Sequence, residues 1–365
     1  MQEQRREHAA RAEERPSPLA RYLFGAYALL VVYASLHPFS GWHGQGPSPF
    51  AFLSAPFPRS FWRFDIVTNV LGYMPLGALA VLAVYPRWRG AKALGFGIAC
   101  SLLLSFVLES LQFYLPSRTS SNVDLLTNTI GGAAGAFLAL PIAPILLREG
   151  GFQTLRYRLF LPGPMIDFGL VLLALWLLSQ LNPETLLFGT GDWHELFQPP
   201  PGKHYPAELF LRVEAVIAGA NTVAIGLFLS CLTARNQPVR LLFCALVLLA
   251  LAVRSTAFGV LLKDLLLWVT PGALSGLAAG WIITMLCMSL PRTARLTVAG
   301  LALAGATILV NLAPENPYMA ASLALWQRGP FFNFNGLTHV VSAGWPFAAM
   351  LYLMFFAAAR GRENA

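Results

Sequence analysis

The strongest constraint on this chain is a series of long apolar segments separated by short polar loops. About ten can be placed, at 19–36, 66–85, 93–115, 123–147, 159–181, 207–233, 241–262, 273–290, 296–313 and 336–358. A run of about 20 apolar residues can cross a bilayer as a helix. Backbone groups in lipid must be satisfied within the chain, which favours helices. The sequence therefore predicts an all-α, polytopic integral membrane protein with about ten transmembrane helices.

The number and distribution of charged residues support the membrane-protein class and predict the orientation of the chain in the membrane. Of the 365 residues, 56% are hydrophobic and 12% are charged, whereas a soluble domain carries about 25% charged residues. Most of the 25 lysine and arginine residues fall in alternate loops, and such loops are usually cytoplasmic. Both termini are therefore predicted to be cytoplasmic. The net charge of +8 is explained by the lysine and arginine residues of the predicted cytoplasmic loops. No nucleic-acid partner is expected, because no basic patch is interleaved with aromatic residues.

Neither a cofactor nor a metal is predicted. Cys100, Cys231, Cys244 and Cys287 lie in apolar segments without C-x-x-C spacing, which is typical of small core residues. No phosphate-binding glycine loop is present. One outer loop gathers acids and histidines whose spacing matches no established metal site: Asp192, His194, Glu195, His204 and Glu208.

The segments divide the chain into five parts. Residues 1–18 form a charged tail predicted to be disordered and cytoplasmic. They are followed by a four-helix module at 19–147, a cytoplasmic loop at 148–158, a six-helix region at 159–358 and a short cytoplasmic tail at 359–365. An internal repeat is one possibility. The stretch DLLTNTIGGAAG from Asp124 is similar to DLLLWVTPGALSG from Asp264, and the stretch from Asn69 to Gly77 is similar to the stretch from Asn221 to Gly226.

Hydrogen-bonding side chains gather where three predicted helices reach the same outer level. Ser105, Glu109 and Gln112 are spaced to share one helical face, and Asp65 and Asn69 form an i, i+4 pair. An acid within an apolar segment is costly, so Glu109 marks either a functional site or a buried partner. The spacing predicts an outward-facing polar pocket.

The fourth predicted helix and the loop before it add to this pocket. Asp124, Asn128 and a stripe of glycines share a face of this helix, and Arg118 lies in the loop. Each has a structural alternative. Asp124 follows Ser121 at capping-box spacing. Arg118 could reach a lipid phosphate or pair with Glu109, and the glycines could serve helix packing.

Three spaced motifs run through the four-helix module. They are Asp65-x-x-x-Asn69-x-x-x-Tyr73-x-Pro75-x-Gly77, Glu109-x-x-Gln112-Phe113 and Pro116-x-Arg118-x-x-Ser121-x-x-Asp124-x-x-x-Asn128-x-x-Gly131-x-x-x-Gly135. Together with YASLHPFSGW before the second segment, they resemble the VanZ-like family over roughly residues 20–147. The resemblance implies a bacterial membrane module of four or five helices, in a family named for a protein that lowers susceptibility to teicoplanin. The helices after residue 159 depart from the small members of that family, which leaves antibiotic resistance open as the task of this chain.

The leading functional hypothesis is a protein of the bacterial inner membrane whose pocket binds or modifies a cell-envelope lipid or glycan. Its expected partners are membrane lipids and a lipid-linked glycan or cell-wall precursor, and binding would alter lipoglycopeptide susceptibility. The candidate ligand-binding residues are Asp65, Asn69, Glu109, Gln112, Arg118, Ser121, Asp124 and Asn128.

Two other classes of function fit the sequence. An enzyme acting on a lipid-linked substrate would use Glu109 as general acid or base, with Asp124 as its partner carboxylate. A transporter or flippase would fit the number of helices and the repeat. The sequence predicts no oligomeric state.

Overall fold

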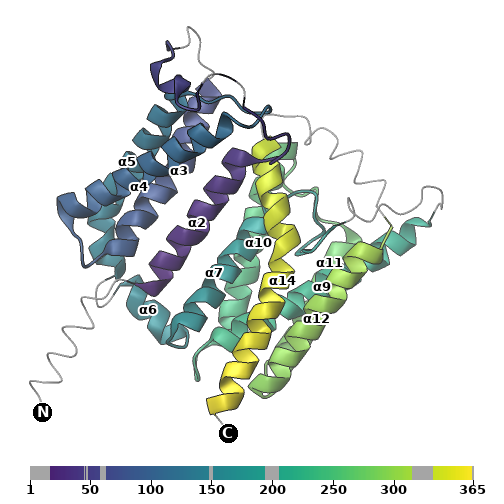
Figure 1. The fold of residues 1–365 in the computed structure, drawn as a ribbon. Coiled ribbons are helices and arrows are strands. Elements are labelled where there is room, and N and C mark those ends of the chain that lie inside the picture. The colour runs from purple at the N-terminus through teal and green to yellow at the C-terminus, as the bar shows by residue number, and fades with distance from the viewer. Residues whose placement is uncertain are drawn as a thin grey trace, which may run out of the picture. The chain divides into compact units, whose positions relative to one another are not determined.

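The computed structural model describes residues 17–44, 46, 48–57, 63–147, 151–193, 205–314 and 332–363. Within these residues the regular secondary structure is helical, apart from one isolated bridge between Phe160 and Thr233 (Figure 1). This confirms the all-α class. The chain divides into two compact units, Met1–Arg158 and Leu159–Ala365.

The N-terminal unit contains four long helices and two short ones. The long helices are α2 (Pro18–Leu36), α3 (Arg63–Val84), α4 (Gly90–Gln112) and α5 (Asn122–Leu147). The short ones are the 3-10 helix η1 (Ala51–Ser54) and α6 (Phe152–Leu159), which occupies part of the predicted loop 148–158. Helix α2 begins where Ser17 Oγ accepts a hydrogen bond from the Ala20 N–H and Pro18 fills the first turn, both common start signals.

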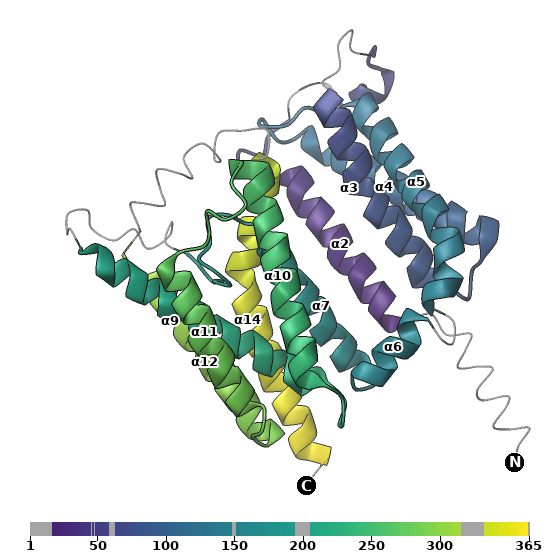
Figure 2. The same cartoon turned by 180° about the vertical axis from the view of Figure 1, so that it is seen from behind.

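The C-terminal unit contains six helices within its described residues. They are α7 (Pro164–Ser179), α9 (Ala207–Leu232), α10 (Val239–Leu262), α11 (Pro271–Cys287), α12 (Arg292–Leu312) and α14 (Phe332–Glu363). Helix α9 is the most buried of the candidate membrane spans, because α11 and α12 both pack along it (Figure 2). Helix α14 packs on α7. The core of this unit is a large apolar cluster around Trp176, Phe228 and Phe243.

Every predicted apolar segment contains a helix, but not every helix is long enough to span a membrane. Within the described residues, 8 helices are long and apolar enough to cross a bilayer. Helices α7 and α11, with 16 and 17 residues, are about 24–26 Å long, short of the roughly 30 Å hydrocarbon core. The predicted segments overran the C-terminal ends of these helices: α7 ends before the turn at Gln180–Asn182, and α11 ends at Cys287 although its predicted segment ran to residue 290.

Glycines bring α3 and α5 into backbone contact. A Cβ atom on Gly131 would lie 2.3 Å from the Val70 carbonyl oxygen, and one on Gly135 would lie 1.8 Å from the Met74 carbonyl oxygen. Any larger side chain at these positions would push the helices apart. The glycine stripe of α5 therefore serves helix packing, which was the structural alternative for these residues.

The same contact register recurs in the C-terminal unit. A Cβ on Gly276 of α11 would lie 2.3 Å from the Ala215 carbonyl oxygen of α9, and one on Gly280 would lie 2.6 Å from that of Gly219. The glycine follows its partner by 61 positions in each pair, as it does for Val70 and Gly131. This register is compatible with an internal repeat, including the predicted match of Gly135 with Gly276, and the repeat itself stays a prediction.

Candidate functional site

The polar residues predicted from sequence meet at one end of the N-terminal unit, where α2 and α4 end and α3 and α5 begin (Figure 1). We call this end the polar end. Most of the side chains there hydrogen-bond to another helix or to a loop, in separate groups that we together name the polar cluster. Its members are Asn69, Ser105, Glu109, Gln112, Arg118, Ser121, Asp124 and Asn128.

Glu109 ties the end of α4 to the start of α5. Its side chain is only 3% exposed, and Oε2 accepts a hydrogen bond of 2.8 Å from the backbone N–H of Ser121. Ser120 Oγ donates to the Glu109 carbonyl oxygen at 2.7 Å. Glu109 therefore has half-buried partners in the loop, while its Oε1 accepts no hydrogen bond from the described residues.

Ser121 is the cap of α5, as its spacing predicted. Its Oγ accepts from the N–H groups of Val123 and Asp124 at 3.2 and 3.3 Å, which satisfies donors that have no partner within the helix. In a capping box the acid three residues later bonds back to the N–H of the capping residue. Here Glu109, from a different helix, bonds to that N–H instead.

Asp124 points across to α3. Its Oδ1 accepts from Asn69 Nδ2 at 2.9 Å, and the same amide nitrogen lies 3.5 Å from Thr127 Oγ1. Asp124 and Asn69 are both half-buried. Asp65, the remaining predicted ligand-binding residue, is exposed at the start of α3, and no hydrogen bond of its side chain occurs within the described residues.

Asn128 lies one turn deeper on α5. Its Nδ2 donates to Ser105 Oγ of α4 at 3.0 Å. Asn128 Oδ1 is buried and has no hydrogen-bond partner among the described residues. An unpaired buried carbonyl oxygen costs free energy, so this atom marks a place where a donor from outside would be stabilising.

Gln112 and Arg118 hold the C-terminal end of α2. Gln112 Nε2 donates to the carbonyl oxygen and to Oγ of Ser35 at 3.1 and 2.9 Å. Arg118 donates from Nε and Nη2 to the His37 carbonyl oxygen and from Nη2 to that of Ala34, at distances of 2.7 to 3.0 Å. Arg118 therefore caps a helix, a role that neither of the predicted alternatives described.

The protonation state of Arg118 follows from its surroundings. The residue lies in the loop between α4 and α5, where burial lowers the pKa of its guanidinium and the nearby Glu109 carboxylate raises it. Arginine stays protonated in proteins despite such shifts, so Arg118 brings a positive charge next to the acids of the cluster.

The structure thus places seven of the eight predicted ligand-binding residues at the polar end, joins Asn69, Glu109, Ser121 and Asp124 in one hydrogen-bonded group, and leaves Asp65 at the edge. Sequence reasoning missed the α2 contribution, which consists of Ser35 and the carbonyl groups of Ala34 and His37. Backbone acceptors leave no residue-type signal, although YASLHPF in the resemblance motif does cover them.

The outer loop with acids and histidines is only partly described. His194, Glu195 and His204 lie outside the described residues. Within the described part of the chain, no group of three histidine, cysteine or acidic side chains is placed to hold a metal ion.

One charged residue of the C-terminal unit is fully enclosed. Arg254 of α10 is 1% exposed, donates to the carbonyl oxygen and Oγ1 of Thr185, and lies over the Phe258 ring at 5.1 Å. These contacts anchor α10 to the segment after α7, which is a structural role.

Comparison with known families identifies the N-terminal unit. Residues 17–147 match the family model described as VanZ/LLP1, a range that contains α2 to α5 and the whole polar cluster. No curated protein and no solved structure matches the chain significantly. With its several membrane-capable helices, this chain is a multi-pass membrane protein that carries a VanZ-like domain at residues 17–147.

Proposed function

We propose that the polar cluster binds a hydroxyl-rich molecule of the bacterial cell envelope, such as the glycan part of a lipid-linked precursor, at the outer face of the inner membrane. The observation that carries this proposal is a set of acceptors with remaining capacity at the polar end: the carboxylates of Glu109 and Asp124 and the buried Oδ1 of Asn128. Binding there would shield or present the precursor and so alter susceptibility to a lipoglycopeptide that targets it.

The chemistry of the acceptors favours hydroxyl groups over phosphate. Each carboxyl group keeps lone pairs beyond the one that the bond from Ser121 or Asn69 occupies. Sugar hydroxyls and ammonium groups can donate hydrogen bonds to these lone pairs, whereas an ionised phosphate diester has no donor. Arg118, the cation of the cluster, already donates three hydrogen bonds to backbone carbonyls.

The same acids favour a second candidate, an enzyme acting on a lipid-linked substrate. Glu109 would move the proton and Asp124 would orient the substrate. Glu109→Gln separates the two functions, because glutamine keeps an acceptor for the Ser121 N–H but cannot transfer a proton. Binding retained without turnover would identify catalysis.

The test of binding is mass spectrometry of the lipids and glycans that co-purify with the full chain in mild detergent. Asp124→Asn keeps an acceptor for Asn69 and removes the charge. Thr129→Val is the matched control, because Thr129 lies on the same helix and its hydroxyl donates only to the Leu125 carbonyl oxygen within the described residues.

We expect a glycan-bearing species on the wild type and on Thr129→Val, strongly depleted on Asp124→Asn at equal helicity by circular dichroism. The same profile on all three proteins would contradict the proposal. Teicoplanin susceptibility of bacteria expressing each protein then tests the consequence, and Asp124→Asn should behave as the empty vector.

A further inference from the structure

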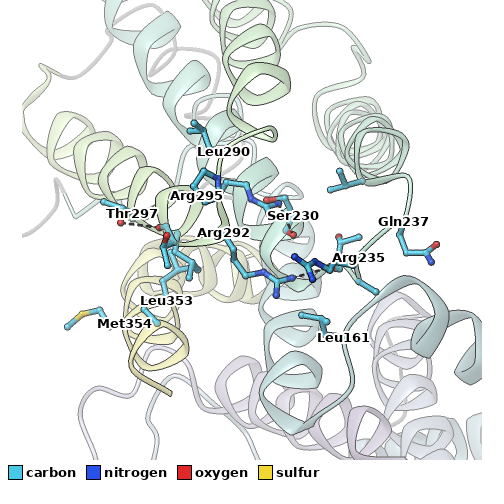
Figure 3. Close-up of a pocket in the computed structure, with 18 of the residues that line it drawn as sticks. Leu161, Ser230, Arg235, Gln237, Leu290, Arg292, Arg295, Thr297, Leu353 and Met354 are labelled. Atoms are coloured by element: carbon cyan, nitrogen blue, oxygen red, sulfur yellow. Dashed lines mark hydrogen bonds between the residues drawn. The ribbon is translucent and has the colours of Figure 1, made fainter. Parts of the chain in front are cut away.

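A large cavity lies in the C-terminal unit, far along the chain from the polar cluster. It has a volume of about 1220 Å³ and is lined by the loop between α9 and α10, the start of α12, the C-terminal half of α14 and Leu161 (Figure 3). Pockets for drug-sized ligands measure about 300–1,000 Å³. The cavity therefore has room for a larger molecule.

Three arginines reach into this cavity. They are Arg235 of the α9–α10 loop and Arg292 and Arg295 of α12, and Figure 3 shows all three extending into the same space. Among the described residues, no acidic side chain lines the cavity. Three cations around one space repel one another, and a bound anion would relieve that repulsion.

Two of the arginines are held in place by backbone contacts. Arg292 Nη2 donates to the Thr233 carbonyl oxygen at 3.0 Å, and Arg295 Nη1 donates to that of Ser230 at 3.3 Å. Arg295 Nε is buried without a hydrogen-bond partner among the described residues. Since a guanidinium group has five N–H donors, Arg295 is both positioned by its backbone contact and able to offer further donors to an anion.

The position of Arg292 and Arg295 at the start of α12 also favours a bound anion. Helix α12 has 21 residues and starts at Arg292, with no acid in its first turn. The N-terminus of a helix carries a partial positive charge that favours anions and disfavours cations. The carbonyl groups of Thr233 and Ser230 offset part of this cost for Arg292 and Arg295, and N–H groups at such a helix end are themselves suited to phosphate.

The walls formed by α14 and by α12 after Arg295 are mainly apolar and partly exposed. Leu301 and Met354 line the cavity and are 69% and 68% exposed. Leu296, Leu353 and Met350 continue the apolar surface. A charged floor with apolar walls suits a molecule that has an anionic head and a hydrocarbon tail.

We propose that this cavity binds the phosphate headgroup of an anionic membrane lipid, with the guanidinium groups of Arg235, Arg292 and Arg295 on the phosphate and the acyl chains along Leu301 and Met354. The predicted orientation places these arginines on the cytoplasmic side, where the leaflet is rich in anionic lipid. The site is separate from the polar cluster and does not depend on the function proposed for it.

Arginines at cytoplasmic helix ends also orient membrane proteins during insertion. If the arginines served only to orient the protein, they would share no ligand. Substituting any one of them would then have the same effect on lipid binding. Arg240 provides the comparison, because it is an exposed arginine in the first turn of α10 that does not line the cavity.

The experiment is a titration of the full-length protein in detergent, followed by native mass spectrometry. The probes are dioctanoyl phosphatidylglycerol, dioctanoyl phosphatidylcholine and inorganic phosphate. The variants are Arg235→Gln, Arg235→Gln with Arg295→Gln, and Arg240→Gln. Arg235 is exposed and makes no hydrogen bond within the described residues, so the single variant should fold even if the double variant does not.

We expect saturable binding of phosphatidylglycerol by the wild type and weaker binding of phosphatidylcholine. Arg235→Gln should weaken phosphatidylglycerol binding about fivefold, the order expected for one cationic side chain near an anionic lipid. The double variant should lose about 25-fold by the same reasoning, and Arg240→Gln should match the wild type.

Three outcomes would overturn the proposal. One is equal affinity for the two lipids, and another is an equal loss in Arg235→Gln and Arg240→Gln. The third is phosphate binding as tight as that of phosphatidylglycerol, because the apolar walls would then contribute nothing and the ligand would be a soluble phosphate.

Discussion

Glu109 acts as the acid of a capping box that is assembled from two helices. The Ser121 N–H would ordinarily bond to a side chain three residues later on its own helix, but Asp124 bonds to Asn69 instead. Glu109 reaches over from α4 to take this N–H. The start of α5 is therefore stabilised by a side chain of α4. Asp124 is not needed at the Ser121 N–H and is available to bond to Asn69 of α3.

This arrangement predicts different stabilities for two substitutions of Glu109. Glu109→Ala leaves the Ser121 N–H without its acceptor, and the loss of a buried partner costs about 1–3 kcal/mol. Glu109→Gln retains an acceptor oxygen and should unfold close to the wild-type temperature. Thermal unfolding of the protein in detergent measures both. Equal melting temperatures for the alanine and wild-type proteins would show that the bond contributes little.

At the scale of elements, the crossing of α3 and α5 is set by backbone contact. Gly135→Ala places a methyl group where the Met74 carbonyl oxygen lies 1.8 Å away, and overpacking of this kind costs about 1–3 kcal/mol. Gly72→Ala is the control, because it lies on α3 with no atom within 4 Å of the added Cβ. We expect a lower melting temperature for Gly135→Ala alone. Similar values for both variants would argue against the crossing seen here.

The C-terminal end of α2 is the second element-scale feature, because it is held by a residue more than 80 positions away. Arg118→Gln cannot supply all three bonds to the carbonyl groups of Ala34 and His37, so the last turn of α2 should fray. Hydrogen–deuterium exchange of peptides covering residues 30–40 should accelerate, while peptides from α5 remain protected. Arg63→Gln, at an exposed position, should leave both unchanged.

The sequence predicted the helices well because apolar runs and their breaks are local signals. It also placed Ser105, Glu109 and Gln112 on one face, and all three are buried. The partners of Arg118 could not be predicted, because backbone carbonyls at a helix end carry no sequence signal and depend on tertiary contact. The lengths of α7 and α11 were overestimated for a related reason, since apolar residues continue beyond the last helical turn.

At the scale of the whole molecule, the two units share a helix-crossing register but differ in their charged residues. In the N-terminal unit the acids Glu109 and Asp124 gather at the polar end, and in the C-terminal unit arginines gather around a cavity. Each unit has its own apolar core. The function proposed for one unit can therefore be tested without altering the other.

The predicted orientation can be tested on the whole chain with single cysteines. Ser117, at the polar end, and Ser289, in the turn between α11 and α12, are both exposed. In a cysteine-free background, a membrane-impermeant maleimide should label Ser117→Cys in intact spheroplasts, and Ser289→Cys only after permeabilisation. Labelling in the reverse order would place both termini and the polar cluster on the other side of the membrane.

The glycine contacts between α3 and α5 also determine which parts of the N-terminal unit can move. Two helices in backbone contact at successive turns have no side chains between them to change rotamer, so they should translate and tilt as one rigid body. Helix α2 is attached at the polar end through the side chains of Gln112 and Arg118, which can swing. Any opening of the polar end to admit a bulky glycan should therefore be a hinge motion of α2, with α3 and α5 as the stationary frame.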